Sequence, residues 1–348
     1  MAVPAFCLAL LVVACSGQPT VDRAATQSSA ESTIADLSRS QSPAAKQLQG
    51  GDDREKAIAA YRRFLEQYPQ SPRRDVIGRR LADLVVESAA DMQATEYTTS
   101  PSAALPVGDS VRKRYEDAIT IYTRLLARHP TDQSTPELLY QLSRAYEETG
   151  QTQLAIATVD QLLAGDPHGQ QRLYADAQFR RGELLFADGA YQQAAKAYSA
   201  VVELGETVSN YEQALYKLGW SYFKEERYDA ALATFFSLLD RKLTAGSDPE
   251  SQLKTLSRAE QEQLADVFRA VSMSFSYQSG VQSVDRYFRR HGRRDYENQV
   301  YLGLADFYVA HDQVSEAAET WLALAQDDPL NPQAPRLYMR AIEQYRKA

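Results

Sequence analysis

The chain has 348 residues, of which 44% are apolar, 24% charged and 10% aromatic, and this composition excludes a disordered, collagen-like or multi-span membrane protein. Its 46 acidic residues outnumber 38 Lys and Arg, and the formal charge of −8 argues against a protein that binds nucleic acid. The two cysteines are Cys7 and Cys15, so no later segment can form a disulfide, a thiolate metal site or a cysteine nucleophile.

Residues 2–14 form an uncharged apolar run that is too short to span a bilayer but has the length of a signal-peptide core. The run ends in Val12-Val13-Ala14-Cys15, which resembles the lipobox of bacterial lipoproteins. The resemblance implies that residues 1–14 are a signal peptide and that Cys15 carries three acyl chains. Such an anchor is firm, because each buried methylene group contributes roughly 0.8 kcal/mol.

The resemblance to the lipobox also predicts where in the cell the protein is located. Ser16 follows the cysteine in place of the Asp of an inner-membrane retention signal, so we expect an outer-membrane lipoprotein that faces the periplasm. No Lys or Arg precedes the apolar run, which departs from the basic start of a signal peptide. The alternative is an ordinary secretory peptide that is cleaved near Ala14, with Cys15 unmodified.

Residues 15–51 are rich in Ser, Gln, Ala and Gly and poor in aromatic residues. This composition predicts a flexible tether that lets a folded body stand away from the membrane. A short helix over residues 29–37 is the alternative within this segment.

Residues 52–330 carry apolar residues at helical spacing, and Pro and Gly fall mainly between the apolar segments, which predicts an all-α body. Small residues recur twelve positions apart on successive helices, and an aromatic or aliphatic residue follows the second small residue by four positions. The pairs, each with this larger residue, are Ser143 and Ala155 with Val159, Gly182 and Ala194 with Tyr198, Gly219 and Ala231 with Phe235, and Ala305 and Ala317 with Trp321.

This register resembles the tetratricopeptide repeat, and it has a steric cause, because two helices cross closely only where the contact residue is small. The resemblance implies an α-solenoid of about six stacked helix hairpins that wind into a right-handed superhelix. Residues 331–348 form one further helix, which is either a cap or the point where a longer protein was cut.

Two insertions lengthen the array, near residues 94–110 and 241–257. The first is polar and contains Pro, and we expect it to form a loop between the helices that carry Ala82 and Ala118. The second precedes a degenerate pair, Ser272 with Val284.

No residue pattern indicates catalysis, and we expect no enzyme activity, cofactor or metal site. The histidines lack metal-ligand spacing, and the chain has no phosphate-binding loop, nucleophile elbow or HExxH motif. Solvated or capping roles account for His129, His168, His291 and His311.

A stack of helix hairpins has a concave face lined by first helices, which suits a partner protein or peptide. Positions three before and one or four after each small residue turn toward this groove. The candidate partner-binding residues are Tyr140, Arg144, Phe179, Glu183, Phe186, Tyr216, Trp220, Phe223 and Tyr277. The alternative is burial between repeats, which we favour for Phe179, Phe186 and Phe223, while Tyr216 and Trp220 are the better candidates.

A second candidate is the basic run Arg286, Arg289, Arg290, Arg293 and Arg294, which could contact anionic lipid or an acidic partner. An ordinary charged outer face of a second helix is the favoured interpretation of this run.

The leading hypothesis is a lipid-anchored scaffold that binds another envelope protein. The pattern is similar to tetratricopeptide lipoproteins, which include the outer-membrane component of the β-barrel assembly machinery, although that component is shorter and its role is not carried over. The alternatives are a docking module for a cell-wall-modifying enzyme and a binder of glycans or small ligands.

Overall fold

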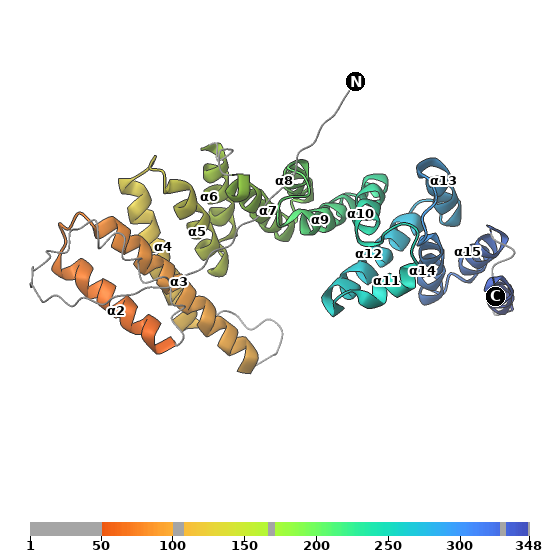
Figure 1. Ribbon diagram of the computed structural model, residues 1–348, viewed down its shortest axis with the longest axis horizontal. Coiled ribbons are helices and arrows are strands. Elements are labelled where there is room, and N and C mark those ends of the chain that lie inside the picture. Colours follow the sequence, from red (N-terminus) through yellow and green to blue (C-terminus); the bar gives the residue numbers. More distant parts are fainter. Residues whose placement is uncertain (1–50, 100–107, 166–170, 328–331, 347–348) are drawn as a thin grey trace, which may run out of the picture. The chain divides into compact units, whose positions relative to one another are not determined.

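The computed structural model describes residues 51–99, 108–165, 171–327 and 332–346, and every regular element in these ranges is a helix (Figure 1). The lipobox, Cys15 and the tether lie outside the described residues. The helices, in chain order, are α2 (Gly51–Gln67), α3 (Arg74–Thr99), α4 (Asp109–Arg128), α5 (Thr135–Glu148), α6 (Thr152–Ala164), α7 (Gln171–Ala187), α8 (Tyr191–Glu203), α9 (Tyr211–Lys224), α10 (Tyr228–Lys242), α11 (Pro249–Thr255), α12 (Arg258–Ser276), α13 (Val281–His291), α14 (Glu297–Ala310), α15 (Val314–Asp327) and α16 (Ala334–Tyr345).

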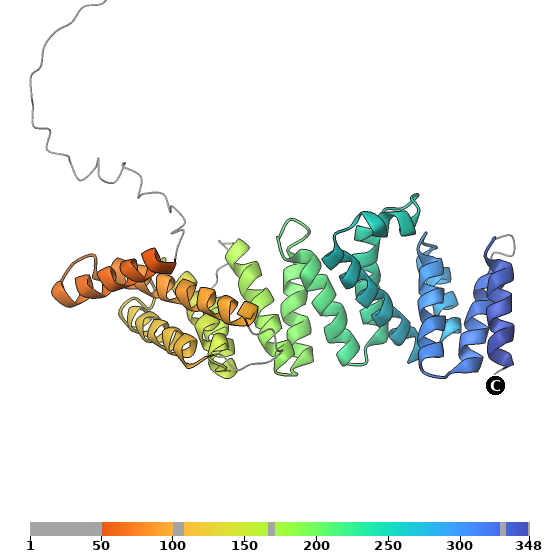
Figure 2. The same cartoon turned by 90° about the horizontal axis from the view of Figure 1, so that it is seen from below.

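From α2 to α10 and from α14 to α16, consecutive helices pack against each other, so that helix hairpins follow one another along the chain (Figures 1 and 2). The hairpins α5/α6, α7/α8, α9/α10 and α14/α15 contain the four small-residue pairs of the sequence register. The predicted all-α solenoid is therefore confirmed for the described residues. None of the described helices is long and apolar enough to cross a membrane.

In α7 and α9, the small residue of the first helix makes room for the larger residue of the second helix. A Cβ atom on Gly182 would lie 2.5 Å from the Tyr198 ring, and one on Gly219 would lie 2.5 Å from the Phe235 ring. Both rings are fully buried. The glycines of α7 and α9 are therefore required by the close approach of a ring, which explains the register in terms of packing.

The packing changes at α12. This helix packs mainly on α10 and α14, and α13 makes few contacts with its neighbours. A Cβ atom on Gly303 would lie 2.9 Å from the Ser272 hydroxyl, so the small residue of α12 faces α14. The degenerate pair of Ser272 with Val284 stays a prediction.

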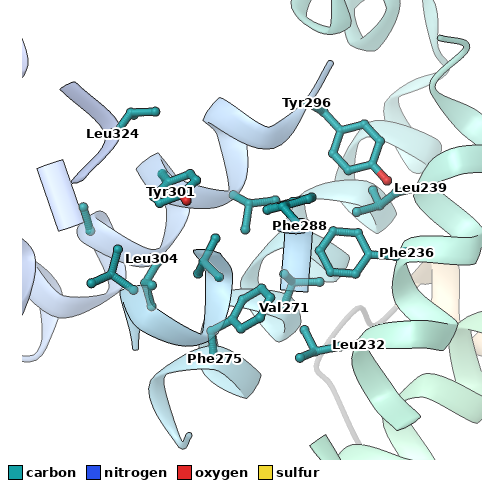
Figure 3. Packing of buried hydrophobic residues seen from close by; sticks show 14 of the residues in the cluster. Leu232, Phe236, Leu239, Val271, Phe275, Phe288, Tyr296, Tyr301, Leu304 and Leu324 are labelled. Atoms are coloured by element: carbon teal, nitrogen blue, oxygen red, sulfur yellow. The ribbon is translucent and has the colours of Figure 1, made fainter. Parts of the chain in front are cut away.

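Aromatic and aliphatic side chains, among them residues of α10, α12, α13, α14 and α15, form the core of this region (Figure 3). The Phe236 ring of α10 lies 4.5 Å from that of Tyr287 and 5.5 Å from that of Phe288, both on α13. The Tyr296 ring packs on the other flank of Phe236 at 6.2 Å. Burial of these aromatic rings holds α13 against α10, although the two helices are not paired as a hairpin.

The insertions differ from simple loops. Residues 94–99 continue α3, and Asp109 and Ser110 begin α4, so the expected loop over 94–110 was wrong at both edges; residues 100–107 lie outside the described part. The second insertion contains the short helix α11, which begins at Pro249 and is capped by the Asp248 carboxylate.

The final helix has two apolar faces. Ala334, Leu337 and Ala341 are buried in the core, whereas Tyr338, Met339, Ile342 and Tyr345 are exposed. A cap usually turns a polar face to water, and the capping role of residues 331–348 stays a prediction.

Candidate functional site

The first helices α9 and α12 are joined by a hydrogen bond and by a ring contact. The Tyr216 hydroxyl donates a hydrogen bond of 2.5 Å to Asp266, and two turns further along the Phe223 ring lies 6.1 Å from that of Tyr277. An open cleft of about 1060 Å³ lies between the N-terminal parts of these helices. The chain segment that joins α10 to α12 is long, and the cleft separates α9 from α12 at this point.

Ion pairs line the cleft, which we call the charged cleft. Lys242 at the end of α10 lies 2.6 Å from Glu212 of α9 and 3.1 Å from Glu260 of α12. Arg241 pairs with Glu212 at 2.8 Å and also with Glu206. These pairs connect α9, α10 and α12 around one opening.

These contacts lower the pKa values of two glutamates in the charged cleft. Burial alone would raise the pKa of Glu212, but hydrogen bonds from Lys242 and Arg241 outweigh it and lower the pKa. The Ser257 hydroxyl and Lys242 lower the pKa of Glu260 to about 2. Glu260 also completes a capping box with Ser257, so one carboxylate both caps α12 and binds α10.

Five aromatic side chains continue from the cleft, three on α9, one at the start of α10 and one at the end of α12. We call them the aromatic row: Tyr216, Trp220, Phe223, Tyr228 and Tyr277. Neighbouring ring centroids lie 5.4 to 6.4 Å apart in a continuous series. Tyr277 is 59% exposed and the other four are partly buried. The row therefore offers ring faces and edges to a partner at the Tyr277 end.

Tyr216 links the row to the cleft. Burial, followed by its hydrogen bond to Asp266, raises the pKa of Tyr216 to about 12. The phenol therefore stays protonated at neutral pH and donates to the carboxylate. Asp266 also pairs with Arg269 at 2.9 Å on its own helix.

The structure thus brings four predicted residues together, Tyr216, Trp220, Phe223 and Tyr277. Trp220 is not wholly on the surface, because its ring packs on Phe235 of the core at 5.9 Å.

The other predicted residues lie on α5 and α7, away from the row. Tyr140 is half-buried beneath the Arg180 guanidinium, 5.9 Å from its ring centre, and Arg144 is exposed. The Phe179 ring packs on Tyr198 at 5.7 Å. Glu183 accepts hydrogen bonds from the Tyr198 hydroxyl and from Lys217, the latter at 3.0 Å, so its carboxylate already has partners within the chain.

Phe186 is half-buried, with the Lys217 ammonium 5.5 Å from its ring centre. The predicted site residues of α5 and α7 stay predictions, and their contacts within the chain favour a structural role for Phe179 and Glu183.

Four residues of these contacts were not among the predicted site residues: Tyr228, Asp266, Arg180 and Lys217. Asp266 lies six positions before Ser272, about one helical turn beyond the position three before it, so the same helical spacing predicts it for the groove face. Arg180 and Lys217 both lie two positions before a small glycine, and each reaches a carboxylate of the preceding first helix.

The histidines take part in local contacts. His129 Nε2 lies 2.8 Å from Asp75, and the rings of His291 and His311 pack on Tyr287 and Phe307. His168 lies outside the described residues. Within the described ranges, no group of three or more His, Cys, Asp and Glu side chains is placed to hold a metal ion.

Comparison with known proteins identifies the repeat. One tetratricopeptide-repeat family model matches residues 112–170 and 140–209, and a second matches residues 44–71 and 213–241. The comparison with curated proteins found no match.

The comparison with solved structures found similar chains at low sequence identity. A tetratricopeptide repeat protein from Parabacteroides merdae is 14% identical, with a TM-score of 0.42, and the match covers 84% of this chain and 93% of that one. The C-terminal part of a repeat-containing protein from Cytophaga hutchinsonii is 14% identical, with a TM-score of 0.43 and coverage of 83% and 96%. YrrB, described as a TPR protein with an unusual peptide-binding site, is 15% identical, with a TM-score of 0.39 and coverage of 67% and 93%. The family models therefore show tetratricopeptide repeats within residues 44–71, 112–209 and 213–241 of this chain.

Proposed function

We propose that the chain is a lipid-anchored scaffold of the bacterial envelope, which binds a segment of another protein along the aromatic row and the charged cleft. The aromatic row supports this most directly, because exposed rings on a rigid helix are typical anchors of protein interfaces. Repeat arrays use surfaces of this kind to hold partner segments and need no chemistry to do so.

The two parts of the surface suit different portions of one bound segment. Apolar side chains of the segment pack on Tyr277, Phe223 and Tyr228, where ring area is accessible. Polar groups of the segment reach the charged cleft, where Arg269 and Glu262 lie at the wall. Such a segment lies along α9 and α12, in line with the helix axes.

A photo-crosslinking amino acid at position 277 tests this surface in living cells. We expect one dominant adduct from position 277 and none from position 68. Tyr68 is the matched control, since it is 56% exposed, packs on a neighbouring ring at 5.0 Å and lies at the end of α2. The adduct is identified by mass spectrometry, and its crosslinked peptide supplies the sequence of the bound segment.

The affinity of that peptide for the purified chain then measures the contribution of the row. Truncation of an aromatic anchor at an interface costs about 2 kcal/mol, so Tyr277→Ser is expected to weaken binding roughly 30-fold. Tyr68→Ser is expected to leave it unchanged. Equal adducts from both positions, or equal affinities of both variants, would contradict the proposed surface.

The membrane anchor rests on the lipobox spelling at Cys15. Cys15→Ser is expected to remove labelling by radioactive palmitate and to leave an unprocessed precursor that no longer fractionates with the outer membrane. Wild-type labelling of this variant would exclude Cys15 as the lipidated residue.

A further inference from the structure

The helix α13 carries three arginines that have no partner within the described residues. Arg293 pairs with Glu297 and Asp327, and Arg294 pairs with Asp240, so two arginines of the basic run are neutralised inside the fold. No ion pair or hydrogen bond holds the remaining three, Arg286, Arg289 and Arg290, to the described part of the chain, and all three are exposed.

A hollow adjoins two of these arginines. It has a volume of about 430 Å³ and lies between α10, α12 and α13. Arg286 and Arg290 line it from the same face of α13, because residues four apart on a helix are neighbours. Leu232 and Phe275 form an apolar floor, and Tyr287 lies between the arginines and the core.

The hollow is basic in a chain that is acidic overall. Among its described lining residues Asp229 is the single acid, and the Gln278 amide donates a 2.9 Å hydrogen bond to that carboxylate. Charges further than about 8 Å away are largely screened at physiological salt, so the net charge of −8 does not cancel this local excess.

Stabilisation of α13 by positive side chains explains only some of its exposed arginines. Positive side chains near a helix C-terminus interact favourably with its dipole, which accounts for Arg289 and Arg290 in the last turn of α13. Arg286 lies one turn earlier, where that benefit has faded, and it stands four residues from the like charge of Arg290. An unpaired guanidinium at a recess with an apolar floor is instead typical of a site that receives an anionic group from outside.

We propose that the α13 hollow, formed by Arg286, Arg290, Tyr287 and the floor of Leu232 and Phe275, binds an acidic segment of a partner protein. A guanidinium forms paired hydrogen bonds with a carboxylate, which suits Asp and Glu side chains. The recess favours a peptide over a membrane surface, because single side chains can enter it and a plane of lipid headgroups cannot. This proposal is independent of the aromatic row, since no row residue lines the hollow.

Fluorescence anisotropy with a labelled peptide of twelve glutamates tests the proposal on the full chain. We expect binding that weakens at least tenfold between 50 and 200 mM salt. The double variant Arg286→Gln with Arg290→Gln is expected to lose at least tenfold in affinity. The control is Arg63→Gln with Arg124→Gln, which removes the same charge from two exposed arginines on α2 and α4 and is expected to stay within twofold of the wild type.

Three results would overturn the proposal. The first is equal loss in the two double variants, because net charge alone would then explain the binding. The second is an α13 variant that keeps wild-type affinity, or a wild-type chain that does not bind the peptide. The third is that the chain does not bind the peptide, but binds phosphatidylglycerol vesicles or self-associates in sedimentation in a way that depends on these arginines. Circular dichroism melting must be unchanged in each variant, and since the side chains are exposed we expect this.

Discussion

A methyl group at Gly219 provides the most direct test of the packing that defines the repeat. Gly219→Ala places a Cβ atom 2.5 Å from Cε1 and 2.7 Å from Cδ1 of Phe235, whereas ordinary carbon contacts are about 3.5 to 4.0 Å. The ring must therefore move by about 1 Å, yet it is fully buried and packs on Trp220. Overpacking of this kind costs about 1 to 3 kcal/mol.

Helix propensity acts in the opposite direction, because Ala is favoured over Gly inside a helix by about 0.5 to 1 kcal/mol. A clash with a confined ring belongs at the upper end of the overpacking range, near 3 kcal/mol. We therefore expect Gly219→Ala to lower the free energy of unfolding by about 2 kcal/mol.

Gly78 of α3 is the matched control. It is buried within a helix, but a Cβ atom there meets Leu125 at 3.7 Å, which is ordinary contact. Gly78→Ala is therefore expected to raise the free energy of unfolding by about 0.5 to 1 kcal/mol, so the two substitutions have opposite signs.

The assay uses urea unfolding followed by tryptophan fluorescence. For the Gly219 variants, a Trp321→Phe background leaves Trp220 as a local reporter on α9 and α10, whereas Gly78→Ala on α3 is followed by the circular dichroism of all the helices. A local reporter is needed because a long repeat array need not unfold in one step.

Phe235→Val then removes the clash by copying the natural pair of Ser143 with Val159. In that background Gly219→Ala is expected to be stabilising. A stabilising Gly219→Ala in the presence of Phe235 would refute the steric account of the register.

The remaining predictions concern polar contacts. Tyr122→Phe removes the donor of a 2.8 Å hydrogen bond to Asp83 without leaving a cavity, and thermal unfolding should show a loss of about 1 kcal/mol; an unchanged melting temperature would show that water replaces the bond. Glu260 has its pKa lowered to about 2 in the fold, below the ordinary value of 4.5, so its stabilising contribution is present above pH 4.5 and is lost as the pH falls toward 2. In acid titrations followed by circular dichroism, Glu260→Gln should therefore reduce the loss of stability between pH 4.5 and 2, and a profile identical to the wild type would exclude this role.

Sequence periodicity predicted the hairpins and their register because these depend on residue size at fixed spacing. Gly182 and Gly219 were recognised as contact positions, and the rings of Tyr198 and Phe235 were recognised as their neighbours. That each ring lies directly over its glycine could not be predicted, because spacing along a chain gives the face of a helix but not the depth to which a side chain enters its neighbour.

The candidate site was predicted less completely than the fold. Tyr216, Trp220 and Phe223 share one helix face, so helical spacing was enough to group them. Their meeting with Tyr277 and Asp266 depends on the path of the chain through residues 243–257, for which no periodic pattern exists. The paired state of Glu183 was missed because its partner Lys217 lies on a different repeat.

Both proposed surfaces follow from the same irregularity in the array. In the regular part, a cation of each first helix pairs with a carboxylate of the preceding one, as Arg180 does with Glu147 and Lys217 with Glu183, and these pairs cover the junctions. At the junction of α9 with α12, the hydrogen bond from Tyr216 to Asp266 stands where the regular junctions have an ion pair. The charged cleft lies open beside this hydrogen bond.

The packing of α12 has a second consequence, because α12 packs on α14 and α13 makes few contacts with its neighbours. A helix in that position presents its arginines to the surroundings, whereas a fully packed second helix would have more of its surface covered by neighbours. The two proposed binding surfaces therefore both lie where the regular stacking of helix hairpins is interrupted. Shortening the join between α10 and α12 should accordingly impair the aromatic row and the α13 hollow together while leaving α5 to α8 folded.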